Sequence, residues 1–128
     1  MFDITAFKKE RLTAGVWKPF SGAELRIASI RSFAFRNAYA AEQRPYQSKI
    51  DKGTLPAETA QELLCRPLAK HVLIDWKNVS ANGVEIPYSV ESAFKALMAN
   101  DELLEFVQSV AVDLSNFTEE QEAEEVKP

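Results

Sequence analysis

The side chains best suited to covalent or metal chemistry lie in one short stretch of the chain. Cys65 and His71, the sole histidine, are six residues apart, and Asp75 follows four residues later. A thiol beside an imidazole is the pair that a cysteine nucleophile needs, because the imidazole can accept the thiol proton. His71 and Asp75 would share one side of a helix, but zinc sites usually need at least about three protein ligands, and neither CxxC nor HExxH occurs.

The surrounding sequence argues against catalysis at these residues. Cys65 lies two residues before Pro67 on a stripe of apolar side chains, with no recognisable oxyanion-hole element nearby. A small apolar core residue explains Cys65 better. The chain also lacks GxGxxG and any phosphate-gripping loop, so we expect neither an enzyme nor a cofactor or metal. A small enzyme that uses Cys65, His71 and Asp75 is the weaker alternative.

Length and charge further limit the classes of protein to which the chain can belong. The chain has 128 residues and a net charge of −4, and residues 118–128, with five glutamates and one lysine, carry all of that net charge. We expect one domain over residues 1–117 and a disordered acidic tail over 118–128. No apolar run approaches the 18 to 20 or so residues of a membrane span, and no signal peptide begins the chain, which predicts a soluble, intracellular protein without membrane contacts.

Arginines in the first third alternate with aromatic residues, an arrangement that nucleic-acid-binding surfaces share. They are Arg26, Arg31, Arg36 and Arg44. Steps of five residues scatter side chains around a helix instead of lining one face, and residues 1–117 hold equal numbers of acidic and basic side chains. We therefore expect a solvated helix surface and no nucleic acid partner.

The spacing of apolar residues predicts the elements that position these side chains. Alternation on both sides of Ser21-Gly22 predicts a hairpin over residues 16–27, and a spacing of three and four predicts a helix over 29–42. A polar loop is expected over 44–55, then a helix over 55–75 with a kink or break near Cys65, caused by Pro67. Ser89 and Asn100 begin two amphipathic helices. The predicted fold class is mainly α: a small single-domain helical protein with a short N-terminal β-hairpin.

Residues 74–94, between two of these helices, combine an Asp-Trp pair, an Asn-Gly step and an isolated proline. Asn82-Gly83 supplies a tight turn, and Val84 and Ile86 suit one strand of a second hairpin whose other strand contains residues 76–79. Trp76 suits the end of a core, where its indole N–H can reach a carbonyl, although aromatic residues also anchor partners. Asp75 caps or pairs locally in this interpretation.

The carboxy-terminal half resembles the tail assembly chaperones of long-tailed bacteriophages. In that family a D-W pair ends a helix, a G-x-x-I/V-P-Y/F-[ST] segment follows, and two short amphipathic helices precede a terminal Phe. The resemblance covers about residues 68–117, and the matching residues are Asp75, Trp76, Gly83, Ile86, Pro87, Tyr88, Ser89, Phe94, Leu97, Leu103, Leu104 and Phe117. Specificity comes from the order and spacing of these motifs, since none is chemically unique.

The resemblance implies a non-enzymatic protein of the host bacterial cytoplasm, absent from the mature virion. It would bind the tape-measure protein, help recruit the tail-tube protein, and form a homo-oligomer. Members often occur in two lengths through a ribosomal frameshift, which implies a C-terminally extended form as a further partner. Candidate contact residues, chosen because their register does not place them firmly in the core, are Trp17, Phe20, Trp76 and Tyr88. The alternative is a virion structural or adaptor protein of the neck or connector.

Overall fold

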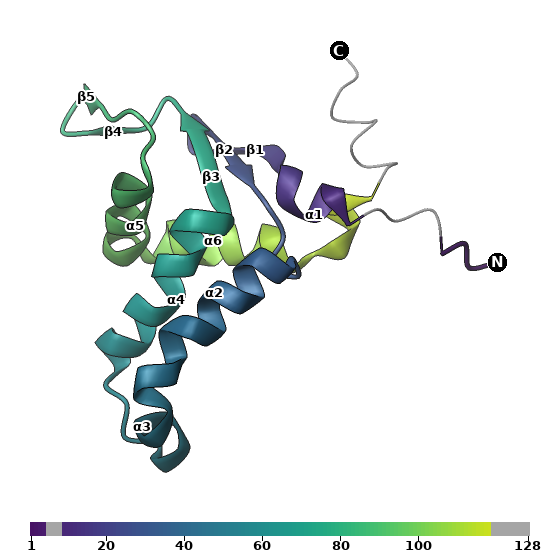
Figure 1. The fold of residues 1–128 in the computed structure, drawn as a ribbon. Coiled ribbons are helices and arrows are strands. Elements are labelled where there is room, and N and C mark those ends of the chain that lie inside the picture. The colour runs from purple at the N-terminus through teal and green to yellow at the C-terminus, as the bar shows by residue number, and fades with distance from the viewer. Residues whose placement is uncertain (5–8, 119–128) are drawn as a thin grey trace.

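A three-stranded antiparallel sheet forms the upper part of the fold, and helices pack against one of its faces (Figure 1). The computed structural model describes residues 1–4 and 9–118. The sheet has the order β1-β2-β3, and a separate two-stranded hairpin, β4-β5, projects from one end. The strands are β1 (Val16–Phe20), β2 (Ala23–Ile27), β3 (Leu73–Lys77), β4 (Ser80–Ala81) and β5 (Val84–Glu85).

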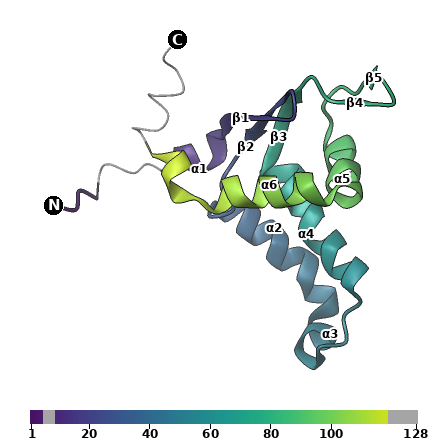
Figure 2. The ribbon, with the colours of Figure 1, turned by 180° about the vertical axis from the view of Figure 1, so that it is seen from behind.

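Helices α2 to α6 form two groups. α2, α3 and α4 extend away from it, while α5 and α6 lie beside the upper half of α4 (Figures 1 and 2). Their bounds are α1 (Glu10–Ala14), α2 (Phe33–Gln43), α3 (Gln47–Lys52), α4 (Ala57–His71), α5 (Val90–Ala99) and α6 (Asp101–Val112), with 3-10 turns η1 (Arg44–Tyr46) and η2 (Leu114–Phe117).

The predicted N-terminal hairpin is confirmed. β1 pairs antiparallel with β2, so that Phe20 lies opposite Ala23. Between these strands Ser21 and Gly22 take φ of 48° and 84°, the left-handed region that a tight turn requires. On β2 the buried Ala23, Leu25 and Ile27 alternate with Glu24 and Arg26, which gives the sheet one buried and one open face.

The predicted fold class was wrong, because the domain is mixed α/β and its sheet has a third strand. The helix expected over 55–75 ends at His71, and Leu73–Lys77 forms β3, which pairs with β2. A short apolar run with β-branched residues suits either a buried helix end or a strand. Here the segment forms a strand because β2 has an edge with which it can pair.

Two further predictions in this region need correction. α4 continues as a helix through Pro67 without a break. The expected polar loop over 44–55 instead contains η1 and α3, and only Gly53, with φ of 68°, makes the predicted turn. The helix expected over 29–42 forms as α2, beginning at Phe33, where the Ser32 side chain accepts a hydrogen bond from the Phe35 N–H.

The predictions for the carboxy-terminal helices are confirmed. The Ser89 hydroxyl accepts from the Ser92 N–H at 3.0 Å and begins α5. The Asn100 side chain accepts from the Leu103 N–H at 3.0 Å and begins α6. Both caps satisfy N–H groups that the helices themselves leave unpaired.

The second hairpin also forms, at slightly different residues from those expected. Ser80 and Ala81 pair with Glu85 and Val84, and the Ile86 N–H donates to the Val79 carbonyl at 2.8 Å. Asn82 and Gly83 make the predicted turn, with φ of 51° and 78°.

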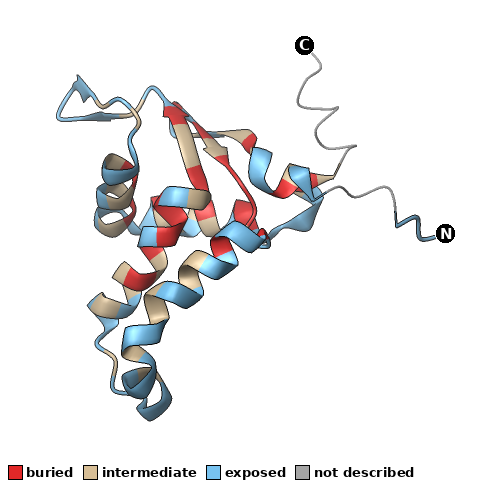
Figure 3. Ribbon diagram, in the orientation of Figure 1, coloured by how far each residue is buried: buried red, intermediate tan, exposed pale blue. Residues whose placement is uncertain are grey.

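The core lies where the buried face of the sheet meets α4, α5 and α6 (Figure 3). In contrast, every residue from 39 to 62 is exposed or half-buried. Within the described residues no helix has both the length and the apolarity needed to cross a membrane. The predicted acidic tail lies outside the described residues, apart from Thr118.

Candidate functional site

The structure separates the three residues considered for catalysis. Cys65 is fully buried within α4, and burial raises the pKa of its thiol from 9.0 to about 11, so the thiol is protonated at neutral pH. His71 ends α4, six residues on and therefore about 120° around the helix. Desolvation and the neighbouring Lys70 lower the pKa of its imidazole.

Asp75 lies on β3, not on a helix face shared with His71. Its Oδ1 accepts a hydrogen bond from the Trp76 N–H at 2.8 Å, which agrees with the expected local role. Residues 1–4 and 9–118 contain no group of three His, Cys, Asp or Glu side chains placed to hold a metal ion. The geometry therefore offers no support for the enzyme alternative at these side chains.

Two of the four predicted contact residues line a groove between the sheet and α5, which we name the sheet groove. It has a volume of about 570 Å³. Its apolar lining includes Phe20, Leu25, Trp76, Val79, Ile86 and Leu103. Phe20 is half-buried and stacks on Phe106 of α6, with the ring centroids 4.8 Å apart.

Trp76 lines the sheet groove and is only 6% exposed. Its indole Nε1–H donates to the Ile86 carbonyl at 2.8 Å, which ties β3 to the residue that follows β5. The Tyr88 ring packs against it edge-on, with centroids 5.5 Å apart. This burial favours the structural role for Trp76 that the sequence also suggested.

Tyr88 is half-buried, and its hydroxyl links two elements of the core. The hydroxyl donates to the Leu73 carbonyl at 2.8 Å, and the Ala69 carbonyl lies within hydrogen-bond distance of the same hydroxyl, at 3.1 Å. Burial and the nearby Asp75 carboxylate raise the pKa of the phenol. Tyr88 therefore holds the segment after the second hairpin against the end of α4.

Trp17 lies apart from the other three predicted contact residues. It faces the open side of the sheet, opposite Arg26, and is half-buried. The Lys77 ammonium lies 4.5 Å from the centre of its ring, a cation–π contact. Trp17 and Trp76 thus lie on opposite faces of the sheet and cannot serve one site.

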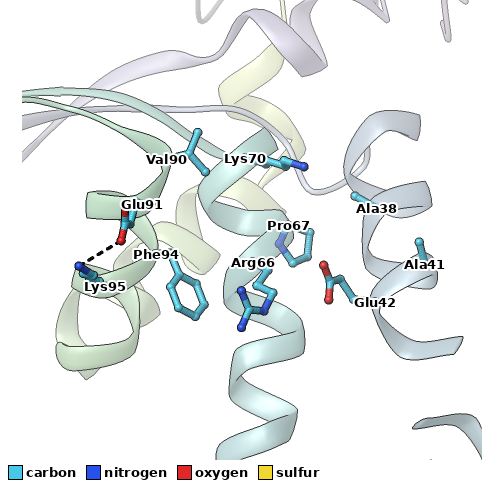
Figure 4. A pocket seen from close by; sticks show the side chains of 10 residues that line it. All are labelled: Ala38, Ala41, Glu42, Arg66, Pro67, Lys70, Val90, Glu91, Phe94 and Lys95. Atoms are coloured by element: carbon cyan, nitrogen blue, oxygen red, sulfur yellow. Dashed lines mark ion pairs between the residues drawn. The ribbon is translucent and has the colours of Figure 1, made fainter. Parts of the chain in front are cut away.

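A second groove runs along α4, between α2 and α5, and we name it the α4 groove (Figure 4). Its volume is about 750 Å³. The apolar part of its lining consists of Ala38, Ala41, Pro67, Val90 and Phe94, and the charged part of Glu42, Arg66, Lys70, Glu91 and Lys95.

Several apolar side chains of the α4 groove remain accessible. Val90 is 44% exposed, and Phe94 is half-buried, with the Arg66 guanidinium 4.8 Å from its ring centre. In the sheet groove, by comparison, Leu25, Trp76 and Leu103 are each under 9% exposed. The α4 groove is therefore the better candidate for contact with another molecule.

Comparison with known proteins places the chain among phage proteins. A family model described as "YdaY prophage protein" matches residues 30–128, more than half of the chain. The chain belongs to the YdaY prophage protein family. No curated protein and no solved structure matches it.

Sequence reasoning missed the α4 groove of this YdaY-family protein. Val90 and Phe94 share the apolar stripe of α5 with buried Ala93 and Leu97, and periodicity alone does not distinguish the accessible pair from the buried pair. The available signal was the width of that stripe, because a broad apolar face can meet two neighbours. Only the packing of α2 and α5 on either side of α4 reveals which edge of the stripe stays open.

Proposed function

We propose that this YdaY-family protein is a tail assembly chaperone of a phage or prophage. In this role it binds the tape-measure protein, keeps that protein soluble and helps recruit tail-tube subunits around it. It acts without covalent chemistry in the host bacterial cytoplasm and is absent from the finished virion. The resemblance of residues 68–117 to tail assembly chaperones and the prophage family of the chain support this proposal.

The observation that carries the proposal is the accessible apolar lining of the α4 groove beside charged side chains. Val90 and Phe94 provide apolar surface, and Arg66 and Lys70 provide cations within the same groove. Helix-in-groove recognition uses such a surface, with apolar anchors for affinity and charges for orientation. A chaperone of this kind needs only weak binding at each site, because repeated contacts along a long partner add through avidity.

Co-expression with the tape-measure protein of the same prophage tests the proposal. The tape-measure protein should enter the soluble fraction and co-purify when this chain is present, and should pellet when it is absent. An unrelated acidic protein of similar size, expressed at the same level, is the control. The proposal fails if the soluble fraction of the tape-measure protein is the same with and without the chain.

Mass spectrometry of purified phage particles separates the chaperone from a structural or adaptor protein of the neck or connector. A chaperone should be missing from particles while present in the lysate. Recovery of this chain in a fixed ratio to the tail-tube protein would establish the structural role instead.

A further inference from the structure

The α4 groove is a place where a further helix can pack on α4, between α2 and α5. α2 and α5 both pack against α4, on opposite sides of it, and form the two walls of the groove (Figure 4). The floor is the strip of α4 that contains Arg66, Pro67 and Lys70. Packed helices lie about 8–10 Å apart, so a further helix can rest on the floor only if the side chains beside it are small.

The α2 wall meets that condition at two of the three residues with which it lines the groove, the third being Glu42. Ala38 and Ala41 stand on it, three residues apart and hence on the same side of the helix. On the α5 wall, Val90 and Phe94 are four residues apart and present the larger apolar surface. An incoming helix would therefore lie close to α2 and pack its apolar stripe against α5.

The walls of the groove carry Glu42 and the Glu91–Lys95 ion pair, at 3.2 Å, while its floor is cationic and sets what a bound stripe must contain. Arg66 and Lys70 are one helical turn apart on the floor, and within the described residues Lys70 makes no ion pair. Arg66 pairs with Glu62 only at 3.6 Å, at the surface of α4. A helix with two carboxylates one turn apart inside its apolar stripe would place an acceptor beside each cation and complete both pairs.

We propose that the α4 groove binds an amphipathic helix of the tape-measure protein that carries two acidic residues one turn apart between apolar residues. This inference rests on the proposed function and adds to it the binding surface and the kind of segment bound. Because such a segment matches the floor cations, they favour it over the purely apolar helices of a long partner.

Two variants of the full chain, each with a matched control, test the groove. Ala41→Glu places a charged side chain on the α2 wall, whereas Ala40→Glu makes the same change at an exposed neighbour that does not line the groove. The double variant Arg66→Glu, Lys70→Glu reverses the floor charge, and Lys49→Glu, Lys52→Glu makes an equal change on α3. Circular dichroism and urea unfolding verify that all four fold.

The binding measurement uses fluorescent peptides that tile the tape-measure protein of the same prophage, read by fluorescence anisotropy. We expect the two groove variants to weaken the tightest peptide by at least about tenfold and the two controls to stay within about twofold. Changing the two acidic residues of that peptide to lysine should weaken wild-type binding and restore binding to the Arg66→Glu, Lys70→Glu variant.

The outcomes separate the two proposals. Groove variants that bind peptides and solubilise the tape-measure protein as the wild type does would overturn the groove inference alone. A change confined to the oligomeric state, seen by light scattering, would assign the groove to a second copy of the chain and also overturn it. If the wild type neither binds any peptide nor solubilises the tape-measure protein, the proposed function fails, and the groove inference with it.

Discussion

Two regions of this molecule differ sharply in how they use apolar side chains. The body, made of the sheet, the end of α4, α5, α6 and η2, buries large side chains such as Leu68 and Phe117 almost completely. The arm, residues 39–62, consists of the end of α2, η1, α3 and the first half of α4, and none of its residues is buried (Figure 3). Stability therefore comes from the body.

The two candidate grooves reflect this division. The lining of the sheet groove includes the core residues Leu25, Trp76 and Leu103, so changes at these positions alter the fold. The α4 groove lies between the body and the arm, with α5 on one wall and α2 on the other. Surface that the arm leaves uncovered is available to a partner at little cost in stability, which is why function and folding can be tested separately here.

The largest expected effect is the loss of a core side chain in the body. Trp76→Ala removes a buried ring and the hydrogen bond to the Ile86 carbonyl, and should lower the free energy of unfolding by about 3–5 kcal/mol. Urea unfolding followed by far-UV circular dichroism measures this loss. If instead the variant kept its stability and lost only the proposed binding to the tape-measure protein, Trp76 would be a contact residue, and assigning it to the structural core of the body would be wrong.

Alkaline pH should destabilise the body through Cys65. Because burial raises the thiol pKa in the folded state to about 11, the unfolded chain loses this proton first. The stabilisation is complete below the unfolded pKa near 9 and is lost as the pH rises to about 11, by about 2 kcal/mol. Urea unfolding between pH 8 and 11 measures it, with Cys65→Ala as the comparison; parallel profiles for the two proteins would contradict the assignment to Cys65.

A smaller effect is expected at the junction of α5 and α6. Asn100→Ala removes the cap that accepts from the Leu103 N–H, and should cost about 1 kcal/mol. Asn100→Asp keeps an acceptor at the same place and serves as the control. Equal losses in the two variants, measured by thermal unfolding, would show that the cap oxygen does not stabilise α6.

The smallest effect should come from the arm. Ile50→Ala on α3 truncates a half-buried side chain and should lower the free energy of unfolding by less than about 1 kcal/mol. Amide hydrogen exchange should also be faster in α3 than in α6, because local opening of the arm exposes little apolar surface. A loss as large as that of Trp76→Ala would mean that arm and body unfold as one unit.

Elements defined by local chemistry were predictable from the sequence. Ser21-Gly22 and Asn82-Gly83 predicted their turns because few residues accept positive φ, and Ser89 and Asn100 predicted their helix starts because their side-chain oxygens satisfy free N–H groups. The burial of Cys65 followed from its place on an apolar stripe. Each of these features depends on a few neighbouring residues.

Features that depend on distant partners were decided only by the tertiary structure. Leu73–Lys77 is a strand because β2 offers it an edge, and no local pattern in that segment distinguishes it from the end of a helix. Likewise, Val90 and Phe94 look like core residues in the sequence, and they line a groove because α2 and α5 pack on opposite sides of α4. Local conformational preferences fix turns and caps, whereas strand pairing and open surface follow from which elements meet in space.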